Sequence, residues 1–263
     1  MNTGITMKKP VILVGVGEMG GVFARGILRS GYPVIPVTRE MDIQLIADHH
    51  PDPALVLVSV AENDLHPTLK KLPSIWHPYI GLLQNELLPL DWEKYDYPQP
   101  TVISVWFEKK KGQDAKVLIS SPAYGPKADL LVKALATLDI PAHELKNADE
   151  LRYELVRKNV YILTTNIAGL VTGGTVDTLW RQHQDLARTI ANEVIDIQEW
   201  LTQHTFDREQ LITGFVEGID GDRDHKCMGR SAPGRLARAL AFADQANLSV
   251  PKLEEIQTKH TNT

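Results

Sequence analysis

The hexapeptide GVGEMG at residues 15–20 constrains the fold more than any other stretch of this chain. It follows the apolar run VILV and precedes a segment with helical spacing that ends at Gly31. A G-x-G-x-x-G placed between a strand and a helix is typical of a βαβ unit that binds a dinucleotide. Gly15 would permit the tight turn, Gly17 the approach of a pyrophosphate, and Gly20 the close packing of helix and strand. A glycine-rich turn without a ligand is the alternative.

Strand-like and helical segments alternate through the first half of the sequence. The continuous apolar run ALVLVSV (residues 54–60) is typical of a parallel strand that helices cover on both faces. The segments TVISVWFEKK and AKVLISS flank the lysine-rich turn KKKGQD, and we expect them to form a hairpin. This pattern predicts an α/β fold with a Rossmann-type doubly wound sheet.

The texture of the sequence changes in the second half. After Asn147, helical patterns run through residues 149–172, 175–204, 207–217 and 233–247, and strand patterns are absent. We therefore place a domain boundary near residue 147, with a Rossmann domain over 1–147 and an all-α domain over 148–263. The C-terminal segment EEIQTKHTNT is expected to be frayed.

Composition limits the classes of function. The formal net charge of −5 argues against a nucleic-acid partner bound by bulk electrostatics. No apolar run approaches the roughly 18 residues of a membrane span. The single cysteine, Cys227, excludes an internal disulfide and fits a reducing cytoplasm. Nine histidines are present, but none has a metal-binding spacing with Cys, Asp or Glu, so no metal is expected.

The end of the second predicted strand bears on the choice of dinucleotide. An NAD site usually has an acidic residue there that binds the ribose hydroxyls, but here the segment VTRE places Thr38 and then Arg39. An arginine suits a 2′-phosphate, because it can donate two charge-assisted hydrogen bonds. NADP is therefore favoured. NAD stays open, since Glu40 could act as the acid if the register shifted by two residues.

Four stretches together resemble the ketopantoate reductase (2-dehydropantoate 2-reductase) family, an NADP-dependent group within the 6-phosphogluconate dehydrogenase-like superfamily. They are the glycine loop with GYPVIPVTR, ALVLVSVAENDLHPTL, LLQNE and VRKNVYILTTNIAGLVTGGT. The resemblance implies that Lys158 is the general acid, that Asn166 holds the substrate, and that Asn85 faces both cofactor and substrate. Together with the glycine motif and the segment VTRE, the resemblance predicts that the cofactor is bound by Gly15, Gly17, Glu18, Met19, Gly20, Thr38, Arg39, Val60 and Asn85.

The sequence also departs from the family's pattern. Glu86 replaces the glycine of the Leu-Gln-Asn-Gly turn, and Ile162 replaces an asparagine four residues after the lysine. Where the family has a glutamate that contacts the substrate hydroxyl and the lysine, this chain offers Pro233 or a neighbour. Asp222 or Asp224 could supply the acid instead, or the acid could be absent.

Lys158 and Asn166 lie about 80° apart around an ideal helix and roughly 12 Å apart along it, so both could line one cleft. A lysine can polarise a carbonyl oxygen and protonate it while a nicotinamide delivers hydride. A surface lysine beside an apolar stripe, and an asparagine bridging helices, are the alternatives. Together with the resemblance, these residues predict an NADPH-dependent reductase that acts on a small 2-keto acid in an interdomain cleft.

Three other possibilities remain open at this stage. The chain could be an imine or β-hydroxyacid oxidoreductase of the same superfamily, or a non-catalytic NADP-binding sensor. The helical domain, which would bind the substrate, could also form a homodimer. The expected partner is a small carbonyl compound, with no nucleic acid and no membrane.

Overall fold

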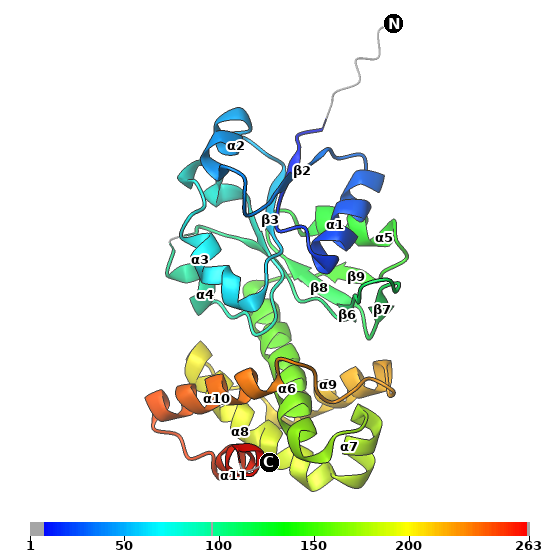
Figure 1. Cartoon of the computed structure of the whole chain (residues 1–263), viewed down its shortest axis with the longest axis vertical. Coiled ribbons are helices and arrows are strands. Elements are labelled where there is room, and N and C mark those ends of the chain that lie inside the picture. The colour runs from blue at the N-terminus through cyan, green and yellow to red at the C-terminus, as the bar shows by residue number, and fades with distance from the viewer. Residues whose placement is uncertain (1–7, 96, 262–263) are drawn as a thin grey trace, which may run out of the picture. The chain divides into compact units, whose positions relative to one another are not determined.

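The computed structural model describes residues 8–95 and 97–261, and its chain divides into two compact units, Met1–Leu151 and Arg152–Thr263. The elements of both units are labelled in Figure 1. Helix α6 (Ala148–Thr172) begins at the end of the first unit and continues as the first helix of the second.

A seven-stranded sheet forms the centre of the first unit, in the order β2-β1-β3-β4-β5-β8-β9. The first five strands in that order are parallel, β8 is antiparallel to β5, and β9 is parallel to β8. The strands are β1 (Val11–Val14), β2 (Val34–Val37), β3 (Leu55–Val58), β4 (Ile80–Leu82), β5 (Thr101–Ile103), β8 (Ser121–Tyr124) and β9 (Ala142–Glu144).

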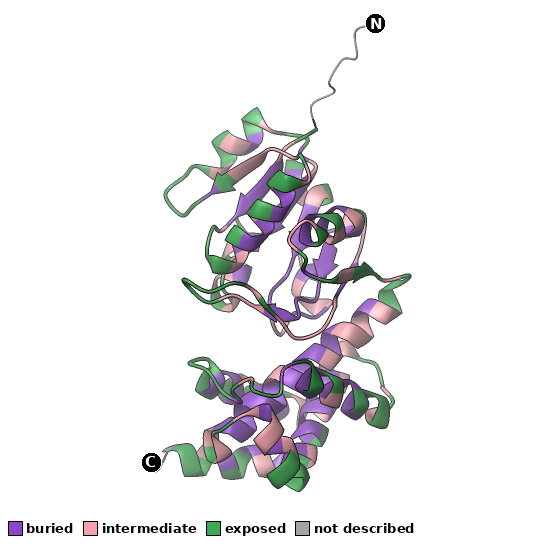
Figure 2. Cartoon of the chain, turned by 90° about the vertical axis from the view of Figure 1, so that its right-hand side faces the viewer, coloured by how far each residue is buried: buried purple, intermediate pink, exposed green. Residues whose placement is uncertain are grey.

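Helices cover both faces of this sheet (Figure 1). Helices α1 (Glu18–Arg29) and α5 (Ala128–Ala136) pack together on one face, and α2 (Ile43–His49) and α3 (Leu65–Leu69) lie on the other. The remaining short helices are η1 (Glu62–Asp64), η2 (Ser74–Tyr79) and α4 (Leu90–Glu93). The strands at the centre are buried and the outward sides of the helices are exposed, as Figure 2 shows.

The burial of the central strands explains their continuous apolar runs. Every residue of β1 and β3 is buried, because alternate side chains point to opposite faces and both faces are covered. Leu13 and Leu57 pack with Phe23 of α1 in the core between the sheet and the α1–α5 layer. These features confirm the α/β class with a doubly wound sheet.

The hairpin expected from TVISVWFEKK and AKVLISS is only partly correct. Strands β6 (Phe107–Glu108) and β7 (Lys116–Val117) do pair as an antiparallel hairpin. The segment Thr101–Ile103, however, belongs to the main sheet, where it pairs with β4 and with β8. Strand β8 has the sequence SPAY, whose proline and small residues give a weak strand signal.

The second unit is helical, which confirms the expected all-α character of the C-terminal part. Its helices after α6 are α7 (Val176–Gln182), α8 (Gln184–Thr202), α9 (Arg208–Gly221), α10 (Ala232–Ala246) and α11 (Pro251–Thr261). The expectation of a frayed C-terminus was wrong as far as Thr261, because residues 251–261 form α11. Glu193 of α8 is buried and accepts the backbone N–H groups of Lys252 and Leu253, which caps α11. Residues 262 and 263 lie outside the described residues.

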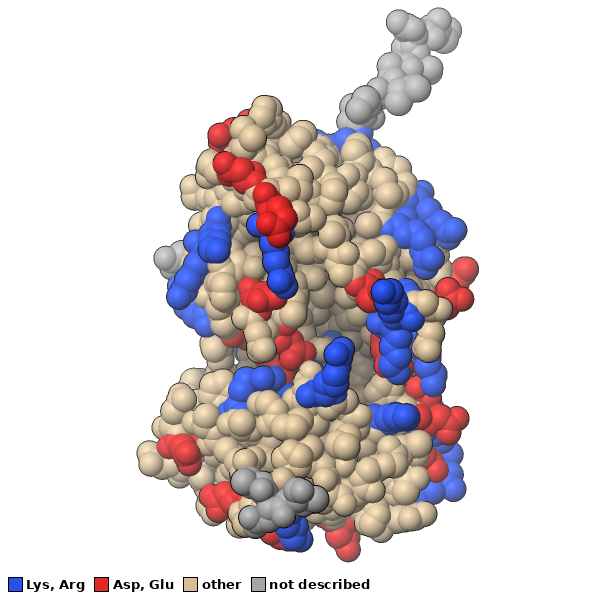
Figure 3. Space-filling model, in the orientation of Figure 1, with Lys and Arg blue, Asp and Glu red and all other residues tan. Residues whose placement is uncertain are grey.

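Among the described residues, no helix combines the length and the apolar character that a membrane span requires. On the face shown in Figure 3, Lys and Arg side chains are interspersed with Asp and Glu.

The contact between α1 and α5 generates a prediction about stability. A Cβ at Gly26 would lie 2.4 Å from the backbone oxygen of Ala134, whereas a Cβ at Gly21 on the same helix would have no neighbour within 4 Å. Gly26→Ala should therefore destabilise the protein by about 2 kcal/mol, as overpacking typically does. Gly21→Ala should stabilise it by about 0.5–1 kcal/mol through helix propensity.

Thermal unfolding followed by circular dichroism would test this pair of variants. Gly26→Ala should lower the Tm by roughly 4–8 °C and Gly21→Ala should raise it. Equal changes in Tm for the two variants would show that the close contact of α1 with α5 does not limit which residue position 26 can hold.

Candidate functional site

The glycine turn after β1 has a backbone geometry that favours glycine at Gly15 and Gly20 and leaves space at Gly17. Gly15 has φ +92°, a left-handed conformation that side chains other than glycine rarely adopt. A Cβ at Gly20 would lie 2.4 Å from the carbonyl oxygen of Gly15, so the helix can approach the turn only with glycine there. A Cβ at Gly17 would meet nothing within 4 Å, which leaves the N-terminus of α1 open to a ligand.

Hydrogen bonds join the turn to the neighbouring strands. The N–H of Gly15 donates to the carbonyl of Val37 at 3.0 Å, and the N–H of Ser59 donates to Val14 at 2.8 Å. The hydroxyl of Ser59 donates to the carbonyl of Gly15 at 2.5 Å. The carboxyl ends of β2, β1 and β3 are thereby fixed beside one another.

A pocket of about 730 Å³ lies at these carboxyl ends. The neighbouring strands β1 and β3 are followed by connections that run in opposite directions, from β1 to β2 and from β3 to β4. Such switch points are where open α/β sheets bind ligands. The predicted cofactor residues Gly15, Gly17, Thr38, Arg39 and Val60 line it. Its other lining residues are Val14, Val16, Val37, Met41, Ile43, Ser59, Ala61, Asp64, Pro67, Thr68 and Lys71.

Two cations stand among the residues that line the pocket. Arg39 follows β2, with its side chain 88% exposed, and forms an ion pair with Asp64 at 3.3 Å. Lys71 follows α3 and is also exposed. Glu40, the residue that a shifted register would place at a ribose, is not among the lining residues.

Four of the predicted cofactor residues do not line this pocket. Met19 packs against the hydrophobic core of the first unit. Glu18 forms an ion pair with Lys109 and borders a separate, smaller pocket. Asn85 is half-buried in the turn after β4. Gly20 lies beneath the turn, where it permits close packing.

The turn that carries Asn85 is held in place by its neighbours. The buried side chain of Gln84 donates to the carbonyls of Val58 at 2.8 Å and Val60 at 3.4 Å, and accepts from the N–H of Leu83. This ties the turn to the end of β3. Glu86 has φ +59°, the left-handed conformation in which glycine costs least. The turn therefore has the backbone shape of a glycine turn without the glycine.

In the second unit, Lys158 and Asn166 are buried on helix α6. Their exposed fractions are 4% and 9%, so the alternative of a surface lysine beside an apolar stripe is wrong. Ile162, one turn after Lys158, is half-buried. Burial of a lysine is costly in free energy, which is why buried lysines tend to serve a specific purpose.

The amide of Asn166 is held by hydrogen bonds to other elements of the second unit. Its Oδ1 accepts a hydrogen bond from Nη1 of Arg235 at 2.8 Å, and its Nδ2 donates to the carbonyl of Cys227 at 3.2 Å. A Cβ at Gly169, one turn further along α6, would lie 2.8 Å from the Cβ of Cys227. The glycine thus lets the loop before α10 approach α6 closely enough for the second bond. Asn166 bridges elements within the second unit, as its alternative interpretation anticipated.

The positions considered for a substrate-facing acid have different surroundings. Pro233 lies in the first turn of α10, a usual place for proline, and has no acidic function. Asp222 is buried at the C-terminal end of α9, with its carboxylate 3.7 Å from Nδ1 of His225. Asp224 is exposed.

Sequence reasoning missed several residues at these places. Lys71 and Asp64 reach the pocket from the segment after β3, and Lys109 reaches Glu18 from the β6–β7 hairpin. A basic or acidic residue in an exposed turn gives no local signal of such a contact. Arg235 offered one signal: with Arg238 it is one of two arginines in the otherwise small and apolar helical pattern of residues 232–243.

Comparisons with known proteins found likeness at the level of structure. No family model and no curated protein matches the sequence. A 2-dehydropantoate 2-reductase from Methylococcus capsulatus superposes with a TM-score of 0.66 at 13% identity, covering 96% of each chain. The dimeric ketopantoate reductase from Staphylococcus aureus gives 0.66 at 16% identity, covering 96% of this chain and 98% of its own.

A third solved structure is D-mandelate dehydrogenase with NADH and anilino(oxo)acetate, with a TM-score of 0.65 at 14% identity over 96% of this chain and 97% of its own. All three share their fold with this chain over nearly its whole length. The chain therefore has the fold of the ketopantoate reductases, as its motifs predicted.

The environment of the single cysteine generates a prediction. Burial raises the pKa of the Cys227 thiol to about 11, so very little thiolate exists near neutral pH. Because the thiolate is the reacting species, Cys227 should react with Ellman's reagent at pH 8 roughly 100-fold more slowly in the native protein than in urea. Rapid labelling of one thiol per native chain would contradict the burial of this residue.

Proposed function

We propose that the chain is an NADPH-dependent reductase that transfers a hydride to a small 2-keto acid, with Lys158 as proton donor. The observation that carries the proposal is the pocket around the glycine turn, because its backbone fits a pyrophosphate and it lies at the switch point of the sheet. Residues 1–147 would bind NADP, and residues 148–263 would provide the substrate-binding helix.

The cofactor is proposed from the residues that the pocket offers. Gly15 and Gly17 give the pyrophosphate a close approach to the backbone, and the N–H groups of α1 would donate to it. Thr38, Arg39 and Lys71 supply a hydroxyl and two cations that suit a 2′-phosphate. No acidic residue follows β2 into the pocket to select the ribose hydroxyls of NAD. Val60 and Asn85 are proposed to lie at the nicotinamide end.

Lys158 is proposed to hold and donate the proton. Bound NADPH would supply the hydride. Nζ of Lys158 would donate a hydrogen bond to the carbonyl oxygen of the substrate and release a proton to it as the alkoxide develops. A buried ammonium acts on a developing negative charge more strongly than one in water, because the effective dielectric constant is lower. The substrate is proposed to bind in an interdomain cleft, as the family resemblance implies.

A 2-keto acid is the proposed substrate class. The solved neighbours named above are reductases of 2-dehydropantoate and a dehydrogenase of mandelate, and the structure of the latter contains NADH and anilino(oxo)acetate. Asn166 is proposed to assist binding, since its Oδ1 can accept a second hydrogen bond beside that from Arg235. Ile162 makes this side of α6 less polar than in the ketopantoate reductases, which favours a less hydroxylated substrate.

Two further attributes are proposed with this function. A homodimer is supported by the dimeric state stated for the ketopantoate reductase from Staphylococcus aureus, and sedimentation would test it. A cytoplasmic location is supported by the lone buried thiol.

Lys158→Met tests the catalytic role directly. The substitution retains much of the side-chain volume and removes the proton donor, so kcat should fall at least about 100-fold. NADPH affinity, measured by fluorescence titration, should stay within about threefold of the unchanged protein. The assay follows NADPH absorbance with a panel of 2-keto acids, cyclic imines and 3-keto acids.

The panel also separates the alternatives. Turnover of imines or 3-keto acids alone would favour an imine or β-hydroxyacid oxidoreductase. Tight NADPH binding without oxidation of any compound would favour a sensor. Unchanged turnover in Lys158→Met would show that another residue donates the proton.

Lys71→Ala tests the choice of NADP, with Lys70→Ala as its matched control. Both lysines are exposed, but only Lys71 lines the pocket. Lys71→Ala should weaken NADPH binding about tenfold by removing one charge-assisted contact, and should leave NADH binding unchanged. Lys70→Ala should change neither. Tighter binding of NADH than of NADPH by the unchanged protein would instead assign the site to NAD.

A further inference from the structure

An acidic residue stands in the glycine turn itself. Glu18 is the first residue of α1, at the N-terminus where the helix dipole favours negative charge. A dinucleotide would place its pyrophosphate at the same N-terminus, so an uncompensated carboxylate there would repel it. Binding at this turn therefore calls for a cation that neutralises Glu18.

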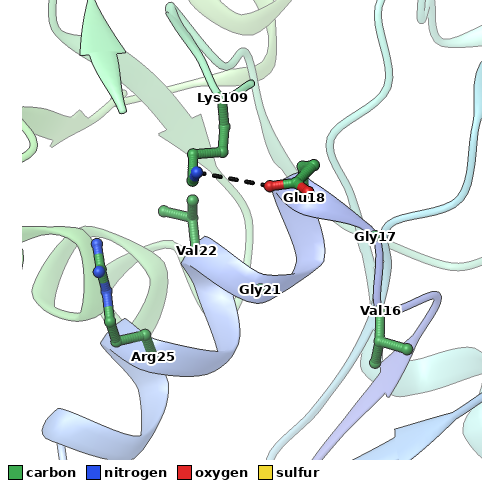
Figure 4. Close-up of a pocket in the computed structure, with 7 residues that line it drawn as sticks. All are labelled: Val16, Gly17, Glu18, Gly21, Val22, Arg25 and Lys109. Carbon is green, nitrogen blue, oxygen red and sulfur yellow. Dashed lines mark ion pairs between the residues drawn. The ribbon is translucent and has the colours of Figure 1, made fainter. Parts of the chain in front are cut away.

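Lys109 is that cation. Its Nζ lies 3.5 Å from the carboxylate of Glu18, and its side chain is only 18% exposed. The same Nζ donates to the backbone carbonyl of Lys110 at 2.8 Å and to that of Gln113, which fixes the ammonium group. Figure 4 shows Lys109 directed at Glu18 over the first turn of α1.

The position of Lys109 follows from packing. Phe107, two residues earlier, is buried and contacts the ring of Phe23 on α1, with 6.2 Å between the ring centroids. Pairing of β6 with β7 turns the chain back immediately afterwards. The hairpin is thus anchored on α1, five residues along the helix from Glu18, and this brings its lysine to the glycine turn.

Glu18 is paired with Lys109 and lies outside the lining of the larger pocket. Glu18 and Lys109 line a separate pocket of about 250 Å³, together with Arg25 of α1. This small pocket shares Val16 and Gly17 with the larger one, so the two pockets adjoin at the glycine turn. Neither Glu18 nor Lys109 lines the larger pocket.

We propose that Lys109 is a positioning residue for dinucleotide binding, which neutralises Glu18 and holds its carboxylate in the small pocket, away from the pyrophosphate. This role rests on the proposed function, because it requires a cofactor phosphate at the glycine turn. The β6–β7 hairpin contributes no residue to the larger pocket. Through Lys109 it would nevertheless affect the affinity for the cofactor.

A double-mutant cycle on the full chain tests this role, with NADPH affinity measured by fluorescence titration. Lys109→Gln should weaken NADPH binding about tenfold, because Glu18 is left uncompensated. Glu18→Gln should bind within about twofold of the unchanged protein, and the double variant within about threefold. The loss in Lys109→Gln should shrink in 0.5 M salt, since the carboxylate of Glu18 is half exposed.

Lys110→Gln is the matched control. It makes the same change of charge in the same turn, but Lys110 pairs with Glu108 and should leave NADPH affinity unchanged. Lys109→Arg should keep most of the affinity. A loss in Lys109→Gln that is equal with and without Glu18, or no loss at all, would overturn the role. Absence of NADPH and NADH binding in the unchanged protein would instead overturn the proposed function, and this role with it.

Discussion

The contact between the glycine turn and the end of β3 is the constraint on which the rest of the first unit depends. The hydroxyl of Ser59 lies 2.5 Å from the carbonyl of Gly15, and a Cβ on Gly20 would collide with that same carbonyl. Glycine at positions 15 and 20 is what allows the strands to end side by side and α1 to begin directly after the turn. The pocket at the switch point, the direction of α1 and the placement of Thr38 and Arg39 follow from this geometry.

A different constraint governs the second unit, where polar groups are buried within a helical core. Asn159 and Gln198 join α6 to α8 through a hydrogen bond of 2.9 Å, and Asn166 joins α6 to α10 and its preceding loop. Each of these amides would destabilise the core if its partner were absent. The same bonds specify which faces of the helices meet. The buried asparagines of α6 therefore contribute to its packing, and Lys158 is buried on the same helix.

Patterns of neighbouring residues in the sequence predicted those structural features that depend on residues close together in the chain. The glycine turn, the buried strand at Leu55–Val58 and the long helices could be read from the sequence, because each depends on neighbours within a few positions. Strand β8 could not, because the pairing of Ser121–Tyr124 with β5 and β9 overrides the weak strand propensity of Pro122. The partners of Glu18 and Asn166 lie 91 and 69 positions away, and no local pattern reports contacts across such distances.

The turn at Asn85 and Glu86 keeps the backbone conformation of a glycine turn, although no glycine occupies it. Glu86 adopts φ +59°, which costs a residue with a side chain about 1 kcal/mol relative to glycine. The backbone keeps that shape because Gln84 fastens the turn to Val58 and Val60, so the hydrogen bonds of a neighbour replace the freedom of a glycine. A chain with 13% identity to a 2-dehydropantoate 2-reductase can share its fold for the same reason. Backbone geometry at the turns and strand ends limits the fold, and different side chains can satisfy it.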